Sequence, residues 1–155
     1  MRQIAKYYAE ADLVQVNGST YSQTKFRVQV QVTFQNPQDT MTQAALLVQT
    51  PAAVNAVGGY IFVLGPLGQW NLQFVTPTGG TQNVASGSVS INSSQLVKMT
   101  AEVQSNVFYG FINNQQVVTY KDNLNPLPGQ VGLLVEGHPG DLKSSILYSN
   151  FELDG

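Results

Sequence analysis

The stretch from Gly59 to Phe74, GYIFVLGPLGQWNLQF, most constrains how this chain can fold. It holds two runs rich in apolar, β-branched and aromatic residues, and the short segment Gly65-Pro66-Leu67-Gly68 separates them. Runs of this kind form β-strands, and glycine and proline between them favour a tight turn. The stretch therefore predicts an antiparallel β-hairpin at the centre of the fold.

Alternating residues predict further strands on both sides of this hairpin. From Phe26 to Phe34 every second residue is apolar, and the residues between are polar. This period of two indicates a strand with one buried and one wet face. Shorter alternating stretches lie at 42–50, 96–104 and 131–135, and no segment has a strong helical pattern. About ten strands joined by Gly, Pro and Asn turns predict an all-β sandwich or barrel.

Length and composition narrow the classes of partner. We expect one domain over residues 1–155, because a chain of 155 residues can bury a sizeable core. Charged residues make up 10% of the chain, and the formal net charge is -2 with only seven Lys and Arg. Nucleic acid is therefore not expected as a partner. The lack of cysteine excludes disulfides, thiolate metal sites and cysteine nucleophiles.

The apolar runs of the chain are too short for membrane insertion. None approaches the roughly 18 residues of a spanning helix, and the N-terminus lacks the apolar core of a signal peptide. We expect an extracellular or cell-surface protein, with this sequence being its mature form or an excised module.

The titratable residues give weak signals for chemistry. Glu10 and Asp12 stand two apart, so on a strand both carboxylates face one way and could hold Ca²⁺. A solvated strand face is the stronger interpretation, and no cofactor is expected. His138 is the only histidine, with Asp141 nearby, but no G-x-S-x-G segment supplies a nucleophile. His138 is therefore interpreted as a turn residue.

The turn of the central hairpin determines which residues share a face. A turn through Pro66-Leu67, or a loop of four residues, makes Val63 face Trp70 and Ile61 face Leu72. The nearly all-apolar face is then predicted to be core, with Trp70 structural. It comprises Ile61, Val63, Trp70, Leu72 and Phe74. The opposite face, predicted to point outward, comprises Tyr60, Phe62, Asn71 and Gln73.

A second set of outward aromatics follows from the alternation further along the chain. Met99, Ala101 and Val103 are predicted to point inward with Phe108 and Ile112. Tyr109 and Phe111 then point outward, near Thr100 and Glu102. A flat ring can cover the apolar face of a sugar while amides and a carboxylate meet its hydroxyls. The alternative is that a loop such as 52–57 or 123–129 covers these aromatics. The candidate ligand-binding residues are Tyr60, Phe62, Asn71, Gln73, Glu102, Tyr109 and Phe111.

The order of several short motifs resembles a known superfamily. The motifs are Gly59-Tyr60-Ile61-Phe62 with Gln69-Trp70-Asn71-Leu72, then Phe108 to Asn114, then Gly129 to Leu133, then Tyr148 to Leu153. Over residues 24–154 this order resembles the concanavalin A-like lectin and glucanase superfamily, in particular bacterial laminin G-like domains. The chain departs from the pattern at Asn114, where the family has Gly, and at Ser149, where it has Asp. The resemblance implies a two-sheet antiparallel β-sandwich of jelly-roll topology that holds sugar chains or proteins.

The same resemblance bears on catalysis. Glucanases of the superfamily carry an E-x-D-x-E strand, whereas here Glu10 and Asp12 are followed by Val14 and stand near the N-terminus. No catalytic residue is therefore assigned. The expected function is a non-catalytic module that binds carbohydrate or a cell-surface glycan. The alternatives are a self-assembling structural subunit of a virion, appendage or cell surface, and a glycoside-processing enzyme of unrecognised mechanism.

Overall fold

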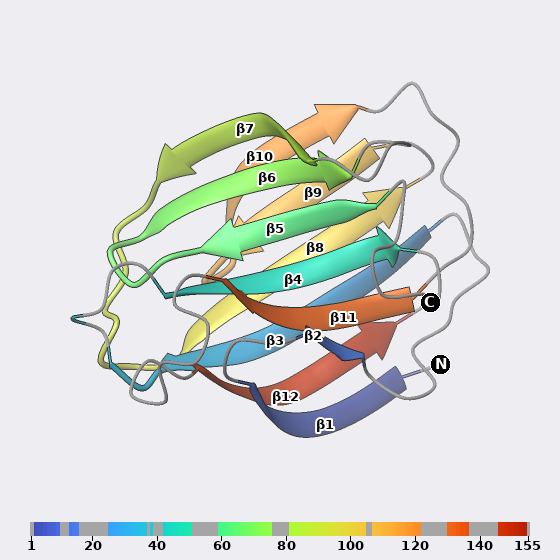
Figure 1. The fold of residues 1–155 in the computed structure, drawn as a ribbon. Helices are drawn as coiled ribbons and strands as arrows, with labels where there is room; N and C mark the ends of the chain where they lie inside the picture. The colour runs from blue at the N-terminus through green and yellow to red at the C-terminus, as the bar shows by residue number, and fades with distance from the viewer. Residues whose placement is uncertain are drawn as a thin grey trace.

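The structure, a computed structural model, describes most of the chain as strands and short turns. The described residues are 2–9, 13–15, 25–36, 38, 42–50, 59–75, 81–104, 107–121, 130–136 and 146–154. They form two six-stranded antiparallel sheets that lie face to face (Figure 1). This arrangement confirms the predicted all-β, two-sheet antiparallel sandwich. The described part of the chain contains no helix of the length and apolarity that crossing a membrane requires.

Each sheet combines strands from distant parts of the chain. Sheet A has the order β1-β12-β3-β8-β9-β10. Its strands are β1 (Arg2–Ala9), β12 (Ile146–Asp154), β3 (Lys25–Phe34), β8 (Val97–Gln104), β9 (Val107–Ile112) and β10 (Gln115–Lys121). Sheet B has the order β2-β11-β4-β5-β6-β7. Its strands are β2 (Leu13–Gln15), β11 (Gln130–Glu136), β4 (Gln43–Thr50), β5 (Tyr60–Leu64), β6 (Gln69–Val75) and β7 (Thr81–Ser88).

The hydrophobic core lies between the two sheets. In β3 the predicted alternation is confirmed, because Val28, Val30 and Val32 are buried while Gln29 and Gln31 are only partly so. The same period of two buries alternate residues of β4, β8 and β9. These residues are Ala44, Leu46, Val48, Val97, Met99, Ala101, Val103, Phe108 and Ile112. Apolar burial of this kind supplies the main favourable term in folding.

The central hairpin is present, but its turn has an odd number of residues. The Gly65 N–H donates to the Gln69 carbonyl at 2.8 Å, and the Gly68 N–H donates to the Gly65 carbonyl at 3.0 Å. The loop between Gly65 and Gln69 therefore has three residues and ends in Gly68, whose φ is 87°. Three-residue hairpin loops commonly end in a residue of this left-handed conformation, which glycine adopts at little cost.

The odd turn shifts the predicted pairing of β5 by one residue. Trp70 lies opposite Leu64 instead of the predicted Val63, and Leu72 lies opposite Phe62 instead of Ile61. Because side chains alternate along a strand, a shift of one residue moves every β5 side chain to the other face. The predicted inward orientation of Ile61 and Val63 is therefore wrong, as is the predicted outward orientation of Tyr60 and Phe62. The inward orientation of Trp70, Leu72 and Phe74 is confirmed.

Tyr60 and Phe62 belong to a group of aromatic rings that connects the two sheets. The ring of Phe108, from sheet A, lies 5.2 Å from that of Tyr60 and 5.9 Å from that of Phe62, centroid to centroid. A glycine in β9 leaves room for these rings. A Cβ added at Gly110 would lie 3.0 Å from the Phe62 ring and 2.6 Å from a methyl group of Val118. A glycine inside a strand thus marks a close approach between the two sheets.

Replacing Gly68 with alanine should destabilise the protein. The new Cβ would lie 1.9 Å from the Val89 carbonyl oxygen, on a backbone already at positive φ. We expect the free energy of unfolding, measured in urea, to fall by about 1–3 kcal/mol or more. The control is Leu67→Ala in the same turn, whose side chain is 70% exposed and should change stability by less than about 0.5 kcal/mol. Equal effects of the two substitutions would contradict the three-residue turn.

Candidate ligand-binding face

The structure places the seven candidate ligand residues in three separate regions. Tyr60 and Phe62 are 2% and 0% exposed in the core, so they cannot take part in a surface site. We call the side of each sheet that points away from the other sheet its outer face. Asn71 and Gln73 lie on the outer face of sheet B. The outer face of sheet A carries the other three, which are Glu102, Tyr109 and Phe111.

The outer face of sheet B is apolar at its centre, and the side chains there are buried. Ala45, Leu47, Ile61 and Val63 form a small hydrophobic cluster there, and none is more than 9% exposed. Beside this cluster the Gln73 side-chain amide donates to Asn71 Oδ1 at 2.9 Å. A ligand would find two amides already bonded to each other and little accessible apolar surface.

The outer face of sheet A carries two adjacent rows of side chains that run across the strands. Directly opposed residues share a face of a sheet, so the pairing register defines each row. The row of Gln29 consists of Glu152, Gln29, Thr100, Phe111 and Gln116. The row of Arg27 consists of Asp154, Arg27, Glu102, Tyr109 and Thr119. The rows lie two residues apart on β3, β8 and β9, or about 7 Å.

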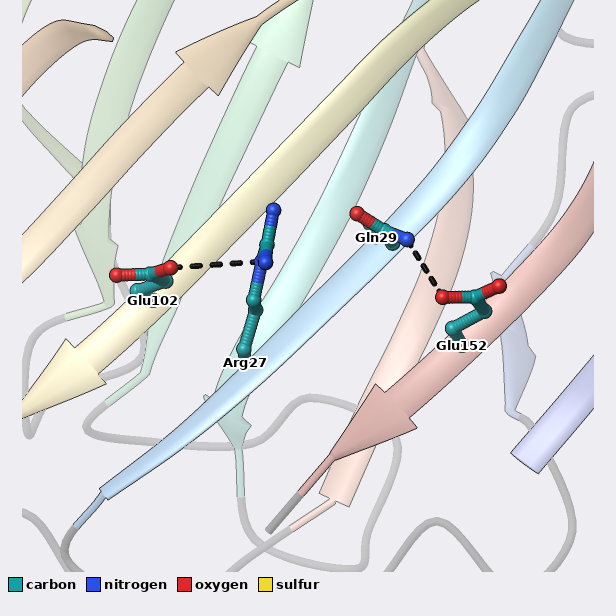
Figure 2. Close-up of polar contacts among 4 residues, drawn as sticks. All are labelled: Arg27, Gln29, Glu102 and Glu152. Carbon is teal, nitrogen blue, oxygen red and sulfur yellow. Dashed lines mark hydrogen bonds and ion pairs between the residues drawn. The ribbon is translucent and has the colours of Figure 1, made fainter. Parts of the chain in front are cut away.

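Two polar contacts hold the β3 side of these rows. Gln29 Nε2 donates to Glu152 Oε2 at 2.5 Å, and Arg27 Nε lies 3.4 Å from Glu102 Oε1. Figure 2 shows that these contacts link β3 to a different neighbouring strand in each row, to β12 by Gln29 and to β8 by Arg27. The Arg27 and Glu102 side chains are 48% and 27% exposed, so their ion pair is screened by solvent and contributes at most about 1 kcal/mol to stability. Its main effect is to orient both side chains.

A bulge in β12 brings Glu152 into the row of Gln29. Ser149 lies opposite Gln31 and Glu152 lies opposite Gln29, so β12 has one residue more than β3 over this interval. Asn150 takes the irregular position with a φ of 52°, a conformation that asparagine tolerates better than most residues. The Asn150 side-chain amide also donates to Gln31 Oε1. Without the extra residue, Glu152 would point into the core.

Tyr109 and Phe111 form the aromatic side of the rows. Both lie on the outer face of β9 as predicted, opposite Glu102 and Thr100, and both are partly buried. They stand two residues apart on one strand, which places two flat rings in adjacent rows. Between the rings and β3 lies Thr100, which is only 1% exposed although it points outward.

The sequence pattern did not identify the residues that β3 and β12 bring to this face. Arg27 and Gln29 were predicted only as the wet side of a strand, and Glu152 appeared only within the motif from Tyr148 to Leu153. Grouping them requires the strand order β12-β3-β8, which joins segments more than a hundred residues apart. The regular polar positions between Phe26 and Phe34 were the available signal, but they do not reveal which strands lie beside them.

The other predicted sites fall on parts of the chain that the structure does not describe. Glu10 and Asp12, the weak calcium candidates, lie outside the described residues, as do His138 and Asp141. Within the described residues no group of three His, Cys, Asp or Glu side chains is arranged to hold a metal ion.

Solved structures similar to this chain carry the same fold. No protein-family model matches the chain. Comparison with characterised protein sequences gave no match either. The carbohydrate-binding module CBM66 from Bacillus subtilis is 14% identical, with a TM-score of 0.67, and the match covers 94% of this chain and 97% of that one. Sheep galectin-11, solved in complex with glycerol, is 12% identical with a TM-score of 0.64 and coverages of 94% and 98%.

A third similar structure is part of a larger protein. The A. japonicus protein CB05 is 12% identical with a TM-score of 0.74, and the match covers all of this chain but 26% of that one. Such low identities show the fold alone. They confirm the predicted fold class, a two-sheet antiparallel β-sandwich of jelly-roll type. Membership of the concanavalin A-like superfamily and of its laminin G-like group stays a prediction.

The different positions of two phenylalanines predict different effects on stability. Phe62→Ala removes a fully buried ring from the core and should lower the free energy of unfolding by about 3–5 kcal/mol. Phe111→Ala removes a partly exposed ring from the outer face and should cost about 1 kcal/mol. Chemical denaturation of both variants measures the difference. A mild effect of Phe62→Ala would contradict the observed register of β5.

Proposed function

We propose that this protein is a non-catalytic module that binds carbohydrate through the outer face of sheet A. The observation that carries the proposal is the pair of rows in which Tyr109 and Phe111 stand beside oriented polar side chains. A sugar presents apolar C–H faces and hydroxyl groups together. On this face the two rings can cover the C–H faces of the sugar. The amide, carboxylate and guanidinium groups can form hydrogen bonds with its hydroxyl groups.

The polar groups of the rows are already held in position. Gln29 is bound to Glu152, and Arg27 is paired with Glu102, so binding would order few additional side chains. Groups that are oriented before binding lower its entropic cost. On the outer face of sheet B, by contrast, the apolar side chains are buried and Asn71 and Gln73 bond to each other. The accessible aromatic surface thus favours sheet A as the binding face.

The similar structures add support of a general kind. A carbohydrate-binding module and a galectin match nearly the whole chain, each over almost its own full length. Because one fold can serve many functions, the likeness supports carbohydrate binding only together with the side chains of the two rows. We further propose that the partner is a cell-surface or extracellular glycan and that binding needs no calcium.

The carboxylates of the rows favour binding over catalysis. Glycoside hydrolysis generally uses two carboxyl groups that flank the scissile bond, one of them as a proton donor. Here Glu102 is paired with a guanidinium and Glu152 accepts a hydrogen bond from Gln29. Both carboxylates thus have a side-chain partner that orients them, as suits groups that bind the hydroxyls of a ligand. Activity on chromogenic glycosides that is lost in Glu102→Gln would replace this proposal with an enzymatic one.

A second candidate function is self-assembly, and one observation favours it. Strand β7 lies at the end of sheet B, and its sequence TQNVASGS contains no charge and no proline. Its eight residues are exposed or partly exposed. Edge strands usually avoid pairing with other chains by carrying charge, proline or bulges, and of these features β7 has only a bulge at Val84, where its register against β6 shifts. Light scattering at increasing concentration separates the candidates, because a stable oligomer favours assembly and a monomer favours a binding module.

The binding proposal predicts that removing both rings weakens binding strongly. A glycan array followed by titration identifies the sugar that the wild type binds best. We expect Tyr109→Ala combined with Phe111→Ala to weaken the affinity for this sugar by about tenfold or more, because stacked rings supply much of the contact. The matched control is Asn71→Ala combined with Gln73→Ala on the other sheet, which should leave affinity within about twofold. Loss of binding in the control alone would place the site on sheet B. Absence of any binding at millimolar sugar would end the proposal.

A further inference from the structure

The side-chain amide of Gln29 has a defined orientation. Its Nε2 donates to Glu152 Oε2, and an ionised carboxylate can only accept hydrogen bonds. The amide nitrogen must therefore face Glu152, and Gln29 Oε1 points the opposite way, as Figure 2 shows. The residue opposite Gln29 on that side is Thr100 of β8.

Gln29 Oε1 and the Thr100 hydroxyl are both buried without a hydrogen-bond partner in the described part of the molecule. Leaving a buried polar atom unpaired costs about 1–3 kcal/mol, so folded proteins rarely retain such atoms without a reason. Two of them occur here at directly opposed positions. Valine has nearly the shape of threonine and would remove one of the two at no loss of packing.

The position of this pair suggests the reason. Thr100 stands in the middle of the row of Gln29, between Gln29 and the ring of Phe111. The Arg27–Glu102 ion pair lies in the adjacent row. An acceptor and a hydroxyl therefore stand side by side at the point where the polar and aromatic sides of the proposed face meet.

We propose that Gln29 Oε1 and Thr100 Oγ1 together recognise one hydroxyl group of the bound sugar. The ligand hydroxyl donates its proton to Gln29 Oε1 and accepts the proton of the Thr100 hydroxyl, so that both atoms gain a partner. Because both atoms are buried before binding, a neighbouring side chain must change rotamer to admit the ligand. Side-chain changes of this kind are common at interfaces. This inference rests on the proposed function.

The same pair defines the chemical class of the ligand. A carboxylate or sulfate cannot donate to Gln29 Oε1, and it would be repelled by Glu102 and Glu152. Arg27 is the only cation among the described side chains of the two rows, and Glu102 already pairs with it. Lys98 on β8 and Lys121 on β10 each lie two residues beyond the rows, so they add no positive charge within them. The ligand is therefore an uncharged sugar rather than an acidic one.

Thr100→Val tests the inference by separating binding from stability. Titrations use neutral oligosaccharides of glucose, xylose, galactose and fructose, with oligogalacturonate as the acidic probe. We expect the wild type to bind a neutral probe and not the acidic one. Thr100→Val should weaken that binding about tenfold while its melting temperature stays the same or rises. Thr100→Ser keeps the hydroxyl and should bind within about twofold of wild type.

The control is Thr33→Val, which makes the same change on β3 of the same sheet, opposite Leu147 and outside the rows. It should leave affinity unchanged. Wild-type affinity in Thr100→Val, with binding lost on removal of Tyr109 and Phe111, would overturn this inference and leave the proposed function intact. A melting temperature that falls strongly in Thr100→Val but not in Thr100→Ser would assign the hydroxyl a structural role and overturn it too. Preference for oligogalacturonate would overturn the ligand class, and binding of no probe would remove the proposed function itself.

Discussion

The three-residue turn between Gly65 and Gln69 is the constraint on which the arrangement of sheet B depends. Gly68 closes this turn at a φ of 87°, and the turn sets the register of β5 against β6. That register sends Tyr60 and Phe62 into the sandwich, where they meet Phe108 of sheet A. This turn conformation therefore determines which rings of β5 meet sheet A. Gly110 leaves the space that the contact between the sheets needs.

The same constraint separates structural aromatics from those that remain accessible. The rings of β5 lie in the core, and the outward positions of that strand are filled by Ile61 and Val63, which are themselves buried. Tyr109 and Phe111 on β9 keep part of their surface exposed. The proposed binding face therefore lies on sheet A, beside polar groups that β3, β8 and β12 contribute.

The parts of the fold that depend on local pattern could be predicted from the sequence. The alternation from Val28 to Phe34 and from Met99 to Val103 gave the correct buried faces. Turns of Gly, Pro and Asn between strands were predicted in general, and one of them lies at Asn113-Asn114, where both residues have positive φ. Register was harder, because loops of two or four residues give one set of faces and a loop of three gives the other. The β8 and β9 part of the sheet A rows was predicted, because it depends on a local hairpin. The residues that β3 and β12 add were beyond prediction, since they depend on strand order and on the bulge at Asn150.

Sugar binding across the outer face of sheet A is the central claim. Backbone amide chemical shifts, followed by NMR during titration with a neutral oligosaccharide, test it most directly because every strand reports separately. We predict that the largest changes fall on β3, β8 and β9, around Gln29, Thr100 and Phe111, while Asn71 and Gln73 hardly shift. Changes centred on β5 and β6 instead would contradict the claim.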